Sequence, residues 1–144
     1  MQLTRYTDYG LRVLLYLALS EEGGTVGEIA AAYGISKNHL LKVSRHLGQL
    51  GYVDATRGKS GGLRLSSKAG SVSVGEVVQA MEPNMDLVEC FDRETGTCPI
   101  AGVCALEVAL HEARRAFLSV LEGIPLRDVV KNRGELSKVL LASS

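Results

Sequence analysis

The sequence of 144 residues predicts a mostly α-helical protein with one small β-hairpin. Three observations support this fold class. Apolar residues recur at helical spacing in several segments, and Ser or Thr residues suited to cap a helix stand at their starts. Two short segments flank a Gly-rich turn near residue 60, as in a hairpin. All three cysteines lie between Cys90 and Cys104, in a segment whose polar residues, Gly and Pro predict a loop.

The length suits one domain, or a small domain with an appendage. The net charge is zero, but residues 1–68 carry nine Lys and Arg against five Asp and Glu, whereas the rest carries seven against eleven. This asymmetry indicates a nucleic-acid surface on the first half only. No run approaches the ~18 apolar residues of a membrane span, and an odd number of cysteines favours a reducing compartment. We therefore expect a cytoplasmic protein with no membrane partner.

Three helices are expected near the N-terminus, over residues 4–20, 25–34 and 36–49. The first starts at a Thr4 cap, and the second starts with a capping box formed by Thr25 and Glu28. Gly34 supplies a tight turn, and Ser36 caps the third helix. Two helices of these lengths around a Gly-containing turn predict a helix-turn-helix.

The third helix has two distinct faces. Its core stripe consists of Leu40, Val43, Leu47 and Leu50. The opposite face is basic or amide-bearing without any acid, and consists of Lys37, Asn38, His39, Lys42, Arg45, His46 and Gln49. An ordinary solvated face would mix charge signs, so we favour a helix that reads the major groove. The candidate DNA-binding residues on it are Lys37, Asn38, His39, Lys42 and Arg45.

Segments 51–56 and 62–66 form the predicted hairpin, with Arg57 and Lys59 at its tip. A helix-turn-helix followed by such a hairpin is a winged helix, and these two bases are placed for phosphates or the minor groove. A further capping box predicts a short helix from Ser73 to Met81. We therefore expect a winged helix-turn-helix DNA-binding domain over residues 1–83.

Residues 84–104 form the predicted cysteine loop. Cys90, Cys98 and Cys104 are soft ligands that suit an iron–sulfur cluster or, less well, a zinc ion. The alternative is three unrelated buried thiols. Because three cysteines crowd into 15 residues of an otherwise Cys-free chain, we favour a metal centre that gathers the three thiols.

Residues 105–144 are expected to form a long dimerisation helix and a C-terminal tail. The apolar positions alternate spacings of three and four, and they are Val103, Leu106, Leu110, Ala113, Phe117 and Val120. This seam could pack on the first helix of its own chain, but two-fold operators favour a homodimer. A short helical turn is expected over residues 126–130, and a mobile polar tail after Asn132.

Several segments together resemble a known family. LTRYTDYGLRVLLYLA, GISKNHLLKVSRHLGQLGYV, RGKSGGLRL, SVGEVVQAMEP and LVECF with its three cysteines are similar to the winged-helix regulators that include IscR, NsrR and RirA. The resemblance covers nearly all of residues 1–130 and is strongest to the NsrR-type members. It implies a homodimeric repressor with one iron–sulfur cluster per subunit, whose cluster-loaded form binds operator DNA and is released by nitric oxide.

The same resemblance addresses the fourth cluster ligand. IscR-type members use a His three residues after the last cysteine, but this chain has Glu107 there. NsrR-type members imply a carboxylate from the first helix of the partner subunit, here Asp8, and favour [4Fe–4S] over [2Fe–2S]. Without that role, Asp8 would form an ordinary surface pair with Arg12. His111 is a reserve candidate.

Two other classes of function remain open. The same frame could sense thiol oxidation, zinc or iron status. A redox enzyme or electron carrier is a distant alternative, because the sequence has no paired carboxylates, no Ser/His/Asp set and no cofactor fingerprint. We expect a protein that is not an enzyme.

Overall fold

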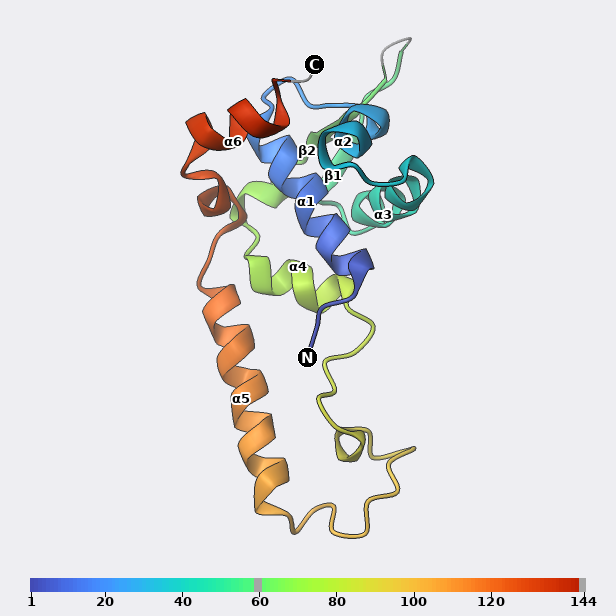
Figure 1. The fold of residues 1–144 in the computed structure, drawn as a ribbon, viewed down its shortest axis with the longest axis vertical. Coiled ribbons are helices and arrows are strands. Elements are labelled where there is room, and N and C mark those ends of the chain that lie inside the picture. Colours follow the sequence, from blue (N-terminus) through green and yellow to red (C-terminus); the bar gives the residue numbers. More distant parts are fainter. Residues whose placement is uncertain (59–60, 143–144) are drawn as a thin grey trace.

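In the computed structural model, which describes residues 1–58 and 61–142, the chain forms a helical body with a long arm (Figure 1). The body contains α1 (Arg5–Leu19), α2 (Val26–Tyr33), α3 (Lys37–Gln49), β1 (Val53–Ala55), β2 (Leu63–Leu65), η1 (Lys68–Ser71), α4 (Val74–Met81), η3 (Leu126–Val130) and α6 (Arg133–Leu140). The arm contains η2 (Glu89–Phe91) and α5 (Ala105–Glu122). The elements labelled η are short 3-10 helices. Among the described residues, none of the helices is apolar over a length that could cross a membrane.

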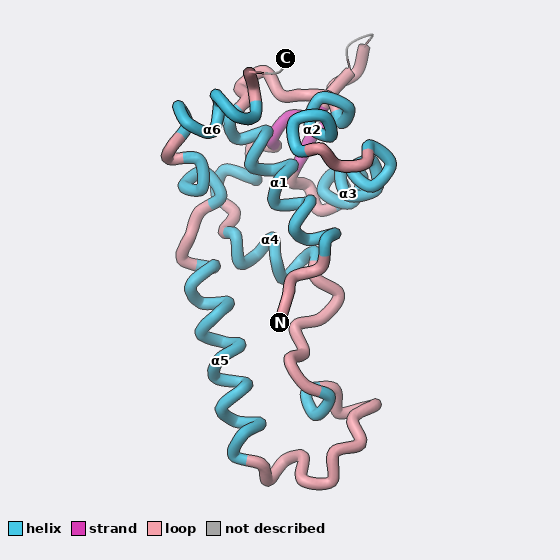
Figure 2. The backbone as a smooth tube through the Cα atoms, viewed as in Figure 1, coloured by secondary structure: helices cyan, strands magenta, loops and turns pink. Residues whose placement is uncertain are grey.

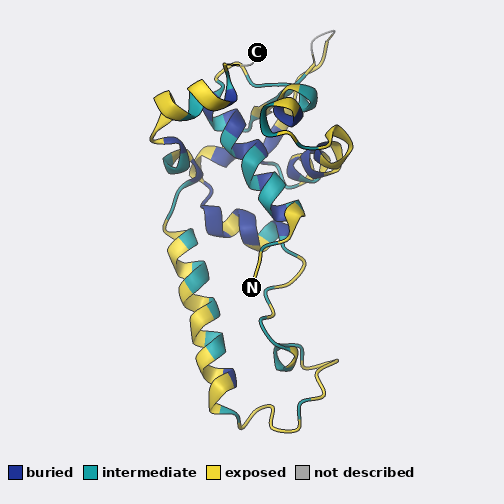
Figure 3. Cartoon of the chain, in the orientation of Figure 1, coloured by how far each residue is buried: buried dark blue, intermediate teal, exposed yellow. Residues whose placement is uncertain are grey.

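Helix α1 is the centre of the body. It packs against α3, α4, η3, β2 and α6, and buried residues gather in the body around it (Figure 3). Val13 and Leu14 of α1 are fully buried. The core continues into α3 through Leu40 and Leu47, which are also fully buried. A shift of α1 is therefore expected to shift α3, because both helices share one close-packed core.

The predicted helix starts are confirmed, with one correction. The side chain of Thr4 accepts a hydrogen bond from a backbone N–H one turn into α1, and both capping boxes, at Thr25 and at Ser73, are formed. Gly34 ends α2 with a φ of +63°, a conformation that glycine adopts without strain. The expectation for Ser36 was wrong in detail: this residue precedes α3, but its side chain makes no capping hydrogen bond.

The predicted β-hairpin is confirmed. Strands β1 and β2 are antiparallel, with Val53 paired to Leu65 and Ala55 to Leu63. The turn before α2 adds a bridge, because Gly24 and Leu63 exchange backbone hydrogen bonds of 3.0 and 2.8 Å. The hairpin is thereby anchored to the helix-turn-helix, and the fold is a winged helix.

The arm leaves and rejoins the body at α4. A long loop leads from the end of α4 to η2 and on to Cys104, after which α5 begins as predicted (Figure 2). The far end of α5 lies so close to α4 that a Cβ on Gly75 would stand 2.6 Å from the backbone nitrogen of Glu122. The chain then pairs with the segment before α4, where the N–H of Leu126 donates to the carbonyl of Val72 at 2.8 Å.

The expectation of a mobile polar tail after Asn132 was wrong. Residues 133–140 form α6, which packs on α1 and α2 and buries Leu140. Arg133 donates to the carbonyl oxygens of Ala18 and Leu19, both at 2.9 Å, and so caps the C-terminal end of α1. The short helical turn before it, η3, is confirmed and buries Val130 in the same core.

Candidate functional site

The outer face of α3 presents the predicted basic and amide side chains to solvent. All five candidate DNA-binding residues on this face are exposed: Lys37, Asn38, His39, Lys42 and Arg45. The opposite face is buried, with Leu40, Val43 and Leu47 at most 1% exposed, whereas Leu50 is half-buried. In the part of the chain that the structure describes, Lys37, Lys42 and Arg45 form no ion pair. Their charges are free for an external anion.

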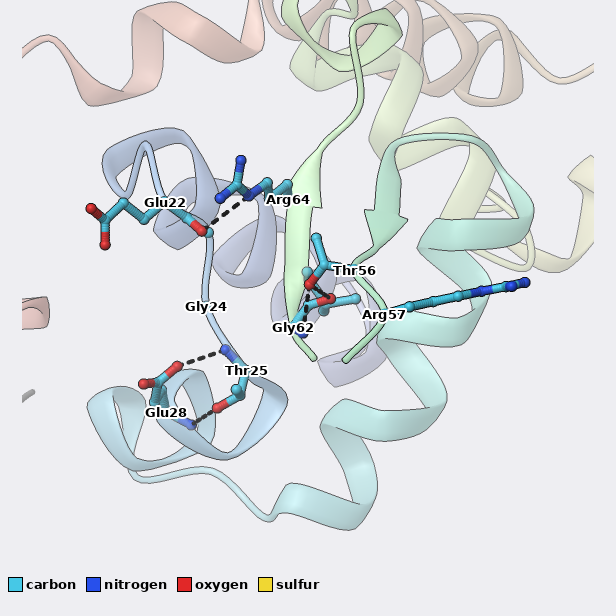
Figure 4. A pocket seen from close by; sticks show the side chains of 10 residues that line it. Glu22, Gly24, Thr25, Glu28, Thr56, Arg57, Gly62 and Arg64 are labelled. Atoms are coloured by element: carbon cyan, nitrogen blue, oxygen red, sulfur yellow. Dashed lines mark hydrogen bonds between the residues drawn. The ribbon is translucent and has the colours of Figure 1, made fainter. Parts of the chain in front are cut away.

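Of the two bases predicted at the tip of the wing, the structure describes one. Arg57 is exposed just after β1, and Figure 4 shows its side chain extending away from Glu22 and Glu28. Lys59, the second predicted base of the wing, lies outside the described residues.

A polar pocket of 480 Å³ lies at the base of the wing (Figure 4). Its polar groups bind each other: Glu28 accepts from the backbone N–H of Thr25 at 2.7 Å, and Arg64 donates to the carbonyl of Glu22 at 3.1 Å. The bond from Arg64 joins the wing to the turn before α2, and the bond from Thr25 belongs to the capping box of α2. The pocket therefore lies where the wing is attached to the helix-turn-helix, and Arg57 is the predicted DNA-binding residue among those that line it.

The three cysteines lie at the end of the arm that is remote from the body. Cys90 is on η2, Cys98 is in the following loop, and Cys104 is the residue that precedes α5. All three are free and partly buried. Desolvation raises the pKa of the Cys90 thiol first, followed by the negative charge of Glu107 and by the two neighbouring thiols.

The structure does not complete a metal site within one subunit. In residues 1–58 and 61–142, no three His, Cys, Asp or Glu side chains stand close enough together to hold a metal ion. The gathering of three thiols expected from the sequence is thus absent from the isolated chain. The donors themselves, three thiols in one loop, have the chemistry that an iron–sulfur cluster requires.

Glu107 holds the cysteine loop and was not among the predicted functional residues. Its side chain is 5% exposed, and it accepts from Arg93 at 2.9 Å and from the backbone N–H of Gly102 at 2.7 Å. Because both oxygens are engaged, Glu107 closes the loop onto the first turn of α5. The only signal in the sequence was an acid one turn into a helix that follows a loop containing a base.

A second contact joins the loop to α5 further along. Phe91, next to Cys90, stacks on His111 with ring centroids 3.8 Å apart, and the Arg114 guanidinium lies 4.7 Å from the Phe91 ring centre. Arg114 also pairs with Asp86 at 3.5 Å. His111, the reserve ligand candidate, therefore has a packing role in this structure.

Asp8 lies in the body, in the first turn of α1. Both of its oxygens accept from Arg12, at 2.9 and 3.0 Å, so the surface pair considered from the sequence is formed. Asp8 belongs to no group of three metal-binding side chains among the described residues. Its assignment as a ligand to the cluster of a partner subunit stays a prediction.

The apolar seam of α5 does not pack on α1. Helix α5 meets the body at α4, and Val103, Leu106 and Val120 are 87%, 65% and 67% exposed. Leu110 and Phe117 line a cavity of 680 Å³ between α5, the segment 82–87 and the N-terminus. A monomer would expose this apolar surface to water, which favours a second protein surface here.

Comparison with solved structures identifies the fold. IscR of T. potens matches with a TM-score of 0.73 at 20% identity, over 94% of this chain and 90% of that chain. CymR, the global cysteine regulator of B. subtilis, matches with a TM-score of 0.72 at 21% identity, over 92% of this chain and 98% of that chain. These two matches show that the chain has their winged-helix fold.

Comparison of sequences identifies the family. The Rrf2 model, described as an iron-dependent transcriptional regulator, matches residues 3–132. The HTH-type transcriptional regulator NsrR of Bacillus subtilis (strain 168) is 48% identical over 142 residues, which is 97% of either chain. This chain belongs to the Rrf2 family of transcriptional regulators.

Proposed function

We propose that this regulator is a homodimeric, DNA-binding repressor that holds one iron–sulfur cluster per subunit and leaves its operator in response to nitric oxide. The observation that carries the proposal is the combination, on one chain, of an acid-free exposed face on α3 with a loop of three partly buried thiols. The similarity to a regulator named NsrR supports the cluster and the signal.

The DNA surface consists of α3 and the wing. Helix α3 enters the major groove, where Lys37, Lys42 and Arg45 face phosphates or guanine, and Asn38 has the donor and acceptor that pair with adenine. His39 lies on the same exposed face. Arg57 and Lys59 on the wing follow the backbone or the adjacent minor groove. In this proposal, a substitution at any of these residues of α3 or the wing weakens the binding of the operator.

The cluster ligands in this proposal are Cys90, Cys98, Cys104 and the partner subunit's Asp8. Because only three cysteines are present, a cubane of the [4Fe–4S] type leaves one iron for an oxygen ligand, and we favour this type over [2Fe–2S]. A bound cluster supplies iron atoms that react with nitric oxide. The oxygen ligand is harder than thiolate and is the weakest of the four.

Asp8 gives the ligand set a direct connection to the DNA surface. It lies on α1, which packs against α3 through the shared core. A bond between Asp8 and the partner's arm holds the two recognition helices at one spacing, as two operator half-sites require. When that bond is lost, Asp8 returns to Arg12, and the spacing is no longer held.

Anaerobic native mass spectrometry tests the proposal. We expect the mass of two subunits with two [4Fe–4S] clusters, and we expect this form to bind a duplex selected from a randomised pool until nitric oxide is added. A dimer with zinc, or one without metal whose DNA binding follows thiol oxidation, would overturn the cluster and establish the zinc or thiol sensor. A cluster-loaded form that responds to iron supply and not to nitric oxide would overturn only the signal.

A further inference from the structure

The first two turns of α1 and the adjoining side of α3 enclose a small hollow. It measures 180 Å³ and is lined by Arg5, Tyr6, Tyr9, His39, Lys42 and Val43. Three of these residues belong to α1, which was assigned no DNA-binding residue from the sequence. The hollow borders the exposed recognition face through His39 and Lys42.

The hollow is basic and its cations are unpaired. Arg5 and Lys42 are exposed, and neither has an ion-pair partner in the described part of the chain. No acid lines the hollow, and the nearest in sequence, Asp8, has both oxygens on Arg12. An anion that enters the hollow meets two positive charges and no repulsion from a carboxylate.

The wall between the two helices is held in place. The Tyr6 hydroxyl donates to the backbone carbonyl of Lys42 at 3.5 Å, and the Tyr6 ring lies 5.7 Å from that of His46. Tyr9 also lines the hollow, and its hydroxyl has no hydrogen-bond partner among residues 1–58 and 61–142. The hollow thus combines fixed walls with two free cations and one free hydroxyl.

We propose that this hollow binds a backbone phosphate of the operator, which makes Arg5, with Tyr9, a DNA-contacting residue on α1. A recognition helix in the major groove has a sugar–phosphate backbone along each side, and side chains of the neighbouring helix position the protein on it. The hollow lies on the side of α3 that faces α1, where such a backbone passes. Its charge and donors match a phosphate and carry no base specificity.

If the proposed function holds, loss of the cluster also changes this phosphate contact. Asp8 is three residues after Arg5 and one before Tyr9, on the same two turns. Whatever binds the Asp8 carboxylate therefore sets the position of the phosphate contact on its own subunit, without a relay through the rest of the fold.

The test compares Arg5→Gln with wild type and with Arg127→Gln, which removes an exposed cation on η3. Binding of the cluster-loaded dimer to a selected duplex and to a random duplex of equal length is measured by fluorescence anisotropy at several salt concentrations. The logarithm of the affinity falls linearly with the logarithm of the salt concentration. We expect Arg5→Gln to make this fall less steep by about 1.8, which is about 0.9 for each subunit. We expect Arg5→Gln to lose the same factor in affinity on both duplexes. Arg5→Lys should keep the salt dependence of wild type, and Arg127→Gln should change neither the affinity nor its salt dependence.

A slope for Arg5→Gln equal to that of Arg127→Gln would overturn the inference, and so would a loss confined to the selected duplex. A second measurement does not depend on the variant. Neutral methylphosphonates placed singly along the selected duplex should weaken binding of wild type at every contacted phosphate, and at one symmetric pair of these positions they should leave binding of Arg5→Gln unaffected. If wild type binds neither duplex, the proposed function fails; if it binds and only these differences are missing, the phosphate contact alone fails.

Discussion

Both carboxylate oxygens of Asp8 are bound by the guanidinium of Arg12, at 2.9 and 3.0 Å. The two side chains are 43% and 42% exposed, and the Arg12 guanidinium also lies 5.7 Å from the centre of the Tyr33 ring on α2. An exposed pair four residues apart on a helix contributes about 0.3–0.5 kcal/mol to stability. A metal ligand bond can therefore displace this pair easily, which makes Asp8 available to a partner subunit.

Asp8→Asn tests the fourth ligand. The amide is a poorer metal ligand and loses the ion pair, so we expect a small loss of folding stability but a large loss of cluster retention under dilution. Native mass spectrometry gives the cluster occupancy, and thermal unfolding gives the stability. Asp54→Asn, an exposed acid on β1, is the control. If the Asp8→Asn variant kept its cluster and its response to nitric oxide, Asp8 would not be a cluster ligand.

Glu107→Gln tests the closure of the cysteine loop. The amide can still accept from the backbone of Gly102, but the ion pair with Arg93 is lost, so the loop should open more often. We expect faster amide exchange across residues 93–104 and unchanged exchange in α1. Glu112→Gln, which removes an exposed acid on the same helix, should leave both regions as in wild type. Equal exchange in the two variants would show that Glu107 does not hold the loop.

A charge placed on the outer face of α5 should separate the dimer. Val120→Asp puts an unpaired carboxylate on an apolar surface, and we expect sedimentation to show monomers whose thermal unfolding is otherwise like wild type. Val139→Asp is the matched control, because Val139 is exposed to a similar extent, 71%, on α6. Persistence of a dimer in the Val120 variant would place the interface on another surface.

Arg133→Ala should destabilise the body. It leaves the carbonyl oxygens of Ala18 and Leu19 without their charged donor and loosens α6. Because the Arg133 side chain is 47% exposed, water can replace part of the loss, and we expect about 1 kcal/mol in the free energy of unfolding measured with urea. Lys138→Ala removes an exposed cation on the same helix and should lower the free energy of unfolding by only a few tenths of the loss expected for Arg133→Ala.

Stability should fall at acid pH through the two capping boxes. Hydrogen bonds from Thr25 lower the pKa of Glu28 below its ordinary value of 4.5, and hydrogen bonds from Ser73 lower that of Glu76 likewise. A lowered pKa in the folded state contributes stability above the unfolded pKa, and this contribution is lost as pH falls through the folded pKa. Unfolding temperatures measured from pH 6 to pH 3 should fall less steeply for Glu76→Gln than for wild type, whereas a Glu94→Gln control should follow wild type.

Local backbone chemistry was predictable from the sequence. Thr4, Thr25 and Ser73 mark helix starts because their oxygen atoms satisfy N–H groups within one turn, a requirement that does not depend on the rest of the fold. The two faces of α3 follow in the same way from helical periodicity, and the three-cysteine loop follows from spacing alone. The resemblance to a family that the Rrf2 match confirms also rests on these local segments.

Contacts between distant segments were decided by the tertiary structure. The docking of α6 depends on Arg133 reaching the end of α1, and the loop closure depends on Glu107 meeting Arg93 across a turn whose path the sequence does not specify. The hollow beside α3 exists because Tyr6 of α1 lies against Lys42. Such pairs have no periodic signal, since each forms only where the packing of the whole core brings two surfaces together. The sequence by itself thus determined helices α1 to α5, the recognition face and the ligand types, whereas the shared core around α1 decided the docking of α6 and which surfaces meet.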